Sequence, residues 1–239
     1  MIELYFYPSP NALKITLMLE ECALPYRIHP INITRGEQFS PEFLAISPNN
    51  KVPAIVDLDA PAGPLALFES GAILVYLAEK TGRFLPADLA GRFKVMKWLF
   101  WQVGGLGPMA GQAHHFRAFA TEHVPYGINR YTNEVNRLYG VLERALKGRE
   151  FVAGDYSIAD MAMWPWVQPH ERQGQNLDDF PAIKRWFAAI EQRPALQRAF
   201  SLGHERHADR EGYRHLYGQT AASLDGGVDS GQAKGGKPS

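Results

Sequence analysis

The sequence has little sulfur and no imbalance of charge. Among its 239 residues there is one cysteine, Cys22, which excludes intramolecular disulfides and cysteine-rich metal sites. Lys+Arg and Asp+Glu both total 25, whereas a nucleic-acid-binding protein shows a basic excess. None of the eight histidines stands in a zinc-ligand spacing. We therefore expect neither a nucleic-acid partner nor a metal.

Long apolar runs are also missing. No run approaches the ~20 residues of a membrane-spanning helix. The start, MIELYFYPSP, lacks the basic residues and the apolar stretch of a signal peptide. These absences predict a cytoplasmic protein with no membrane partner. From about Gly218 the chain is rich in Gly, Ser and Ala, with almost no apolar bulk, and is predicted to be disordered.

Strand and helix signals alternate over roughly the first 80 residues. Alternating apolar positions predict a strand at residues 2–7, and Pro30 marks a second strand at 26–33 as an edge or irregular strand. Between them an apolar stripe with helical spacing ends at Cys22, which indicates a buried packing residue and not a reactive thiol. The pattern continues with a short helix at 40–47, strands at 51–58 and 64–70, and a helix that Ser70 caps and Gly82 ends.

This order, β-α-β-α-β-β-α, predicts a thioredoxin-like domain with a mixed four-stranded sheet. After residue 88 only helical patterns occur, and the pair Ser157–Asp160 is typical of a capping box at a helix start. Composition changes near Pro86. The fold class is therefore α/β plus all-α, with a thioredoxin-like domain at 1–83, an all-helical domain at 88–204 and a C-terminal extension at 205–239.

The turn at Ser9 and Asn11 is the first of three polar stretches. A strand runs into a helix there, and a helix N-terminus offers unpaired N–H groups and a positive dipole end to an anion. A redox fold of this outline would carry a Cys-x-x-Cys pair at the turn, but no cysteine is present. Taken alone, both residues are also ordinary turn and N-cap residues.

The second stretch is NNKVPAIVD and the third is FESG. The Val52–Pro53 bond is a candidate for a cis peptide, which would present the Val52 backbone to an extended peptide ligand. Ser70 begins a helix whose free N–H groups would hold a carboxylate, and Glu69 would take an ammonium group. As an alternative, Ser70 is a plain N-cap. A ligand with an amino-acid end, a peptide middle and a thiol would span all three stretches, and glutathione is such a ligand.

NNKVPAIVD followed by LFESGAILVYLAEK resembles the glutathione-binding core of cytosolic glutathione transferases, and YSIADMAMWPW resembles their helix-capping motif. YPSPNALKITLMLEE and LFWQVGGLGPMAGQAHHF are similar to the bacterial nu class, the glutathione-dependent disulfide-bond reductases. That class typically has Thr at the position of Ser9, so this chain lacks one methyl group there and keeps the hydroxyl.

The resemblance implies a homodimeric disulfide reductase that uses the thiolate of bound glutathione. The ligand would be one or two glutathione molecules, or glutathione disulfide. Asn11 and Ser9 would donate hydrogen bonds to the sulfur. The residues expected to bind glutathione are Gln38, Lys51, Val52, Pro53, Glu69, Ser70 and Arg130. The co-substrate is expected to contact Phe116 and Tyr126.

Two other functions stay open on the sequence alone. One is a conjugating transferase or an organic hydroperoxide peroxidase, and the other is a non-enzymatic regulator on the same fold. Tyr5 or Tyr7 is an alternative donor to the sulfur, as in other transferase classes, although both tyrosines also suit packing positions.

Overall fold

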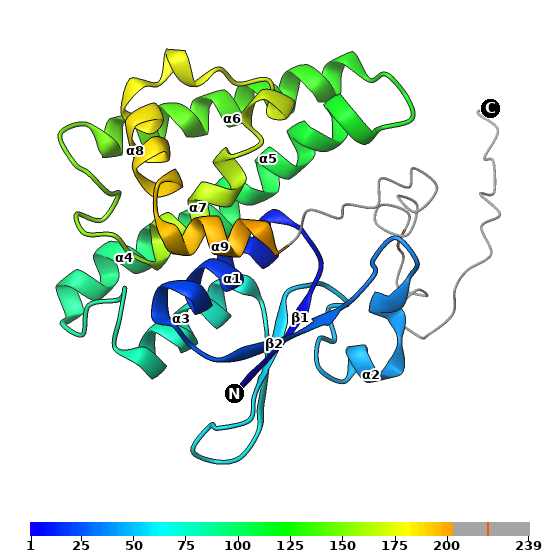
Figure 1. Cartoon of the computed structure of the whole chain (residues 1–239). Helices are drawn as coiled ribbons and strands as arrows, with labels where there is room; N and C mark the ends of the chain where they lie inside the picture. Colours follow the sequence, from blue (N-terminus) through cyan, green and yellow to red (C-terminus); the bar gives the residue numbers. More distant parts are fainter. Residues whose placement is uncertain (203–218, 220–239) are drawn as a thin grey trace.

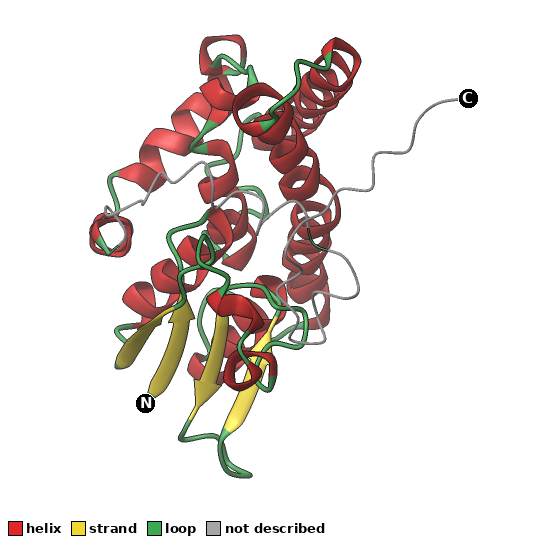
Figure 2. Cartoon of the chain, turned by 90° about the vertical axis from the view of Figure 1, so that its right-hand side faces the viewer, coloured by secondary structure: helices red, strands yellow, loops and turns green. Residues whose placement is uncertain are grey.

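The computed structural model describes residues 1–202 and residue 219. Its sheet has the order β2-β1-β3-β4, built from β1 (Ile2–Phe6), β2 (Tyr26–Pro30), β3 (Ala54–Asp57) and β4 (Leu65–Phe68). The β1–β2 pair is parallel and the other two pairs are antiparallel, as the strands in Figure 2 show. The predicted mixed four-stranded sheet is confirmed, and Pro30 ends an edge strand.

Helices cover both faces of the sheet. The alternation in β1 buries Ile2, Leu4 and Phe6, while Tyr5 on the opposite face contacts Phe43 of α2 (Pro41–Leu44). On the first face α1 (Pro10–Cys22) packs against α3 (Ser70–Thr81). Figure 1 shows α1 and α3 on one side of β1 and β2, and α2 on the other side.

The described chain after β4 forms helices and no further sheet. Two π-helices, η2 (Gln102–Leu106) and η3 (His115–Phe119), flank α5 (Gly107–His114). The other helices of this half are α4 (Leu89–Trp101), α6 (Pro125–Leu146), α7 (Ile158–Val167), α8 (Pro181–Glu191) and α9 (Pro194–Ser201). Short 3-10 helices are η1 (Glu37–Phe39), η4 (His170–Gln173) and η5 (Leu177–Asp179). The predicted all-helical second half is confirmed.

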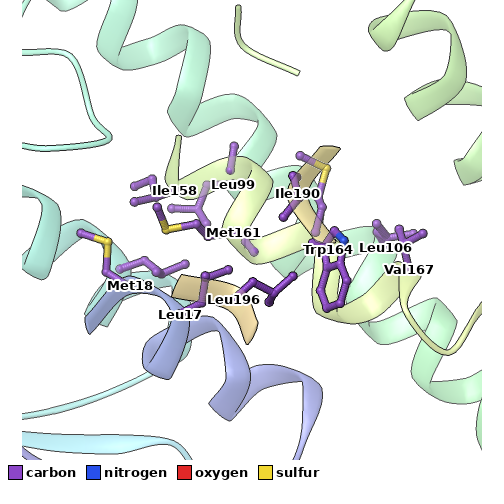
Figure 3. Close-up of a cluster of buried hydrophobic side chains, with 14 of the residues drawn as sticks. Leu17, Met18, Leu99, Leu106, Ile158, Met161, Trp164, Val167, Ile190 and Leu196 are labelled. Carbon is purple, nitrogen blue, oxygen red and sulfur yellow. The ribbon is translucent and has the colours of Figure 1, made fainter. Parts of the chain in front are cut away.

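Helix α1 joins the two halves. Residues 14–19 are all buried, because α3, α7 and α9 pack around the helix as well as the sheet. Leu17 and Met18 lie beside Leu196 of α9 and Met161 of α7 in the close-up of the core (Figure 3). Each such side chain contributes about 1.5–3 kcal/mol by leaving water.

The start of α7 is fixed by a fully buried carboxylate. Asp160 accepts hydrogen bonds from Val152 N, Ser157 N and Ser157 Oγ, each at 3.1 Å, and from Trp186 Nε1 at 2.9 Å. Ser157 in turn caps the first turn of the helix. The predicted Ser157–Asp160 capping box is confirmed.

Two local predictions need correction. Ser70 is not the N-cap of α3: the N-cap is Glu69, because its carbonyl accepts the first intrahelical bond, from Ile73 N at 2.9 Å. Cys22 is half-buried instead of buried, because it lies at the last residue of α1, where the helix meets the surface.

The predicted boundaries at 83 and 88 stay a prediction; they fall between α3 and α4. The predicted tail, 205–239, lies outside the described residues except for Gln219. Within the part of the chain that the structure describes, no helix combines the length and the apolarity needed to cross a bilayer.

Candidate functional site

The N-terminus of α1 is built by Ser9 and Pro10. Ser9 has extended backbone (φ −144°), and its Oγ accepts a hydrogen bond from Ala12 N at 3.3 Å. Pro10 occupies the first helical position, where its missing N–H is no loss. Since Ser9 Oγ is the acceptor in the cap, the hydroxyl proton is left to be donated to a ligand.

Asn11 is oriented by the helical half of the molecule. Its Oδ1 accepts a hydrogen bond from Trp166 Nε1 of α7 at 2.8 Å. An indole nitrogen is a donor only, so this contact decides which end of the amide is the oxygen. The amide NH₂ of Asn11 is thereby directed away from Trp166 as a donor at the helix N-terminus.

The loop before β3 carries a cis peptide bond between Val52 and Pro53, as the sequence predicts. Ser47 Oγ holds this loop by donating to Lys51 O at 2.9 Å. Asn50 Nδ2 and Lys51 Nζ both donate to Gln219 Oε1, at 3.1 and 2.7 Å. Two donors thus converge on a single oxygen, which is the arrangement that a carboxylate needs.

The N-terminus of α3 has no side-chain cap. Glu69, the N-cap residue, has φ 69° and ψ 108°, a sparsely populated backbone conformation for a non-glycine residue. Its carboxylate accepts from Asn49 Nδ2 at 3.3 Å, which ties α3 to the loop before β3. Ser70 follows with its side chain buried and its hydroxyl unused in capping. Free N–H groups at such an end form an anion site.

A lysine lies beneath Ser70. Lys14 of α1 is 1% exposed, and its Nζ donates to Gln102 Oε1 at 2.6 Å and to Ser70 Oγ at 3.3 Å. Burial lowers the pKa of Lys14 to about 7, against a smaller opposing effect of the Glu69 carboxylate. Lys14 and Trp166 are the two residues that sequence reasoning missed. The sequence does carry a signal for Lys14: it lies four residues before Met18, so it falls on the apolar face of the helix, where a lysine is unusual.

The structure therefore links α1 to α3 through Lys14 and Ser70, and α3 to the loop before β3 through Glu69 and Asn49. Gln38 is buried, and its Nε2 donates to Ile33 O at 3.2 Å. Phe116 stacks on Tyr131 with ring centroids 5.4 Å apart. Arg130 is exposed on α6, and Tyr126 in the first turn of that helix is 76% exposed. The contacts that hold Phe116 lie within the helical half.

The sulfur and the tyrosines of the protein lie in other surroundings. Cys22 is at the far end of α1, roughly 16 Å from Asn11 by helix rise. Burial raises the pKa of its thiol, which contacts Thr81 Oγ1 at 3.6 Å. Tyr5 stacks on His29, which favours its packing role. Among the described residues, no three His, Cys, Asp or Glu side chains gather closely enough to hold a metal ion.

The site can be compared with known proteins. Residues 8–80 match the family model of the glutathione S-transferase N-terminal domain, and residues 128–194 match that of the C-terminal domain. The disulfide-bond oxidoreductase YfcG of Escherichia coli K12 is 54% identical over 212 residues, which cover 86% of this chain and 99% of the relative. The disulfide-bond oxidoreductase YghU of that organism is 42% identical, over 82% of this chain and 73% of its own.

Solved structures agree in fold. A glutathione transferase from Pseudomonas putida, crystallised with one glutathione disulfide per subunit, is 45% identical with a TM-score of 0.81, over 84% of this chain and 91% of its own. One from Pseudomonas fluorescens, with two glutathione molecules bound, is 45% identical with a TM-score of 0.79, over 83% and 92%. Since both family models match and these relatives align over most of the sequence, the chain belongs to the glutathione S-transferase family.

Proposed function

We propose that the protein is a glutathione-dependent thiol-disulfide oxidoreductase whose attacking sulfur belongs to bound glutathione. The observation that supports this most directly is the contact between Trp166 and Asn11. It leaves the Asn11 amide NH₂ as a fixed donor at the N-terminus of α1, beside the free proton of Ser9. A donor and a helix N-terminus both favour a thiolate over a thiol.

The chemistry is two successive exchanges. The glutathione thiolate attacks a disulfide, forms a mixed disulfide with one half and releases the other half as a thiolate. A second glutathione thiolate attacks the glutathione sulfur of that mixed disulfide, forms glutathione disulfide and releases the remaining thiolate. Two glutathione molecules supply the two electrons. This reaction requires a compartment that holds reduced glutathione, so we place the protein in the cytoplasm.

The ligand would lie across the three stretches of the site. Its γ-glutamyl carboxylate would bind the uncapped end of α3 at Ser70, and its ammonium group would face Glu69. The Val52 backbone beside Pro53 would pair with the peptide. The glycyl carboxylate would take the place of Gln219 Oε1 against Lys51, and we assign Gln38 and Arg130 to the same ligand. We assign Phe116 and Tyr126 to the co-substrate.

We also propose a homodimer. Large apolar side chains are exposed on β4, which precedes α3 in the chain, and on α4, which follows it. Leu65 and Phe68 are 37% exposed, Phe100 64%, Phe93 60% and Leu89 74%. A second copy that covers these side chains would remove them from water. Sedimentation of wild type and of a Phe93→Lys variant tests this: we expect a dimer for the first and a monomer for the second.

Three parallel assays test the reaction. A model disulfide, an aryl halide and cumene hydroperoxide are each offered with glutathione to the wild type and to a Cys22→Ala variant. We expect turnover of the disulfide to exceed both other activities and to survive loss of the only cysteine. Preference for the aryl halide or the peroxide would favour the alternative enzymes, and no turnover at all would favour the regulator.

A further inference from the structure

Lys14 is a buried lysine whose hydrogen-bond partners among the described residues are all neutral. It is 1% exposed and forms no ion pair with any residue in 1–202 or with Gln219. Both of its hydrogen-bond partners, Gln102 and Ser70, are neutral. A buried charge is normally paired, because an unpaired charge in the protein interior is expensive. This position is therefore poorly explained as a contribution to folding.

The surroundings of Lys14 are arranged around an ammonium group. The distance of 2.6 Å to Gln102 Oε1 is short, as for a charge-assisted bond. With Oε1 turned to Lys14, Gln102 Nε2 is buried and has no hydrogen-bond partner within the described part of the chain. Gly107 makes room for this orientation, since a Cβ there would come within 2.7 Å of Gln102 Nε2. The fold accepts an unpaired amide in order to point an oxygen at Lys14.

Lys14 also decides the direction of the Ser70 hydroxyl. Ser70 Oγ accepts from Lys14 Nζ at 3.3 Å, so its own proton is left for an acceptor on the side away from Lys14. On that side lies the uncapped N-terminus of α3, where Ser70 is only 7% exposed. A carboxylate held there by Ser70 would sit one hydroxyl away from the buried ammonium.

We propose that Lys14 is a positioning residue whose missing counterion is the amino-acid carboxylate of the ligand, so that ligand binding is coupled to protonation of Lys14. The inference rests on the proposed function, because it takes glutathione as the ligand. It deepens that function by assigning to Lys14 the positive charge of the carboxylate site. Ser70 lies between the two groups, because its hydroxyl accepts from Lys14 and donates to the carboxylate.

Apart from Glu69, the charged groups on the elements around Lys14 contact other described residues. From α3 the Glu69 carboxylate acts on it and raises its pKa, and η2 presents the neutral Gln102. The other charged groups on elements packed against α1 are engaged in contacts of their own: Asp160 in the capping box, and the pairs Lys80–Asp57, Arg92–Glu79, Arg193–Glu21 and Arg198–Glu20.

The sign of the coupling follows from the burial. In the free protein Lys14 is close to half neutral at pH 7, because its pKa is about 7. A carboxylate beside it favours the charged form and raises that pKa, so binding takes up a proton. Affinity should be constant well below pH 7 and fall by up to about tenfold per pH unit above it.

Calorimetry with S-methylglutathione tests this, because a thioether has no thiol to titrate. Titrations in buffers of different ionisation enthalpy count the protons taken up, between pH ~6 and ~8.5. We expect uptake of about half a proton at pH ~7 for wild type. Lys14→Met should bind about tenfold to a hundredfold more weakly at pH ~6 and take up no proton. The exposed Lys94→Met serves as the control and should match wild type.

Two further measurements separate the possible failures. Lys51→Met should weaken binding but keep the proton uptake, which excludes the neighbouring lysine as its source. If Lys14→Met does not fold, ¹³C NMR of the lysine side chains in wild type still reports whether the ligand raises the pKa of Lys14. Binding with unchanged proton uptake in Lys14→Met, or an unmoved Lys14 resonance, would overturn the inference and leave the proposed function standing. Absence of any binding to wild type would instead overturn the proposed function.

Discussion

Two buried polar clusters lie at the starts of α7 and α3, and they differ in how well they are satisfied. At α7, four donors surround the two oxygens of Asp160. At α3, among the described residues, Lys14 forms no ion pair and Gln102 Nε2 has no hydrogen-bond partner. A complete cluster stabilises the fold, whereas an incomplete one has capacity left for a ligand. We therefore assign a structural role to the cluster at α7 and a ligand-binding role to the cluster at α3.

The largest expected effect concerns the complete cluster. Asp160→Ala leaves its buried donors unpaired, at about 1–3 kcal/mol for each donor that finds no new partner. We expect a loss of roughly 3–5 kcal/mol in the free energy of urea unfolding, with little change in glutathione affinity per folded molecule. Asp160→Asn keeps one acceptor oxygen and should lose less. A stable Asp160→Ala protein with altered affinity would reverse the assignment of the two clusters.

Asn11→Ala removes a hydrogen bond made to a charged sulfur. Such a bond is worth about 1.5–3 kcal/mol, or about tenfold to a hundredfold in kcat/KM for disulfide reduction. The pKa of the bound glutathione thiol, followed by thiolate absorbance against pH, should rise in parallel. Ser70→Ala and Glu69→Ala are the matched controls: they should weaken binding and leave the thiol pKa alone. An unchanged thiol pKa in Asn11→Ala would move the donor role to Ser9, Tyr5 or Tyr7.

Lys14→Met tests the incomplete cluster through stability. The native pKa of Lys14 is about 7, below its ordinary value of 10.5, so between these values the unfolded chain binds more protons. Wild-type stability relative to Lys14→Met should therefore rise with pH in this window, by up to about 1.4 kcal/mol per pH unit. Below pH ~7 Lys14→Met should be the more stable protein. Equal slopes for both proteins in urea unfolding against pH would show that Lys14 does not titrate there.

Trp166→Phe keeps an aromatic ring over Gly111 but removes the indole donor to Asn11. Loss of one neutral hydrogen bond is worth about 0.5–1.5 kcal/mol, so we expect a loss of about twofold to tenfold in kcat/KM and a raised thiol pKa. Trp164→Phe is the matched control on the same helix. Its indole donates to Phe187 O at 3.1 Å, away from the site, so this variant should keep the thiol pKa. Equal thiol pKa values in both variants would show that Trp166 does not position Asn11.

The smallest effect is expected for Cys22→Ala. A half-buried thiol with a raised pKa is a poor nucleophile, so disulfide reduction should proceed at the wild-type rate. The small cavity should lower the free energy of unfolding by about 1 kcal/mol or less. A folded Cys22→Ala protein without activity would make the protein sulfur, and not the ligand sulfur, the nucleophile.

The sequence was sufficient where the signal is local. Alternation in β1, the edge position of Pro30 and the capping box at Ser157 are each visible within a few residues, and all are confirmed. It was insufficient where partners are distant. Trp166 is 155 residues from Asn11, and Gln102 is 88 residues from Lys14, so no local pattern indicates either bond. The cap of α3 was misplaced because serine is a strong N-cap residue, whereas Glu69 takes that place with a positive φ.

The burial of α1 on all sides limits how this protein can be recombined. Residues 14–19 have no exposed face, because α7 and α9 cover what the sheet and α3 leave open. A crossover between two relatives near residue 85 would pair an α1 from one parent with covering helices from the other. Such chimeras should fold only when the residues of α7 and α9 that contact α1 are inherited together with it. The glutathione-binding half can thus not be exchanged independently of the rest. Its evolution is tied to that of helices more than 130 residues later in the chain.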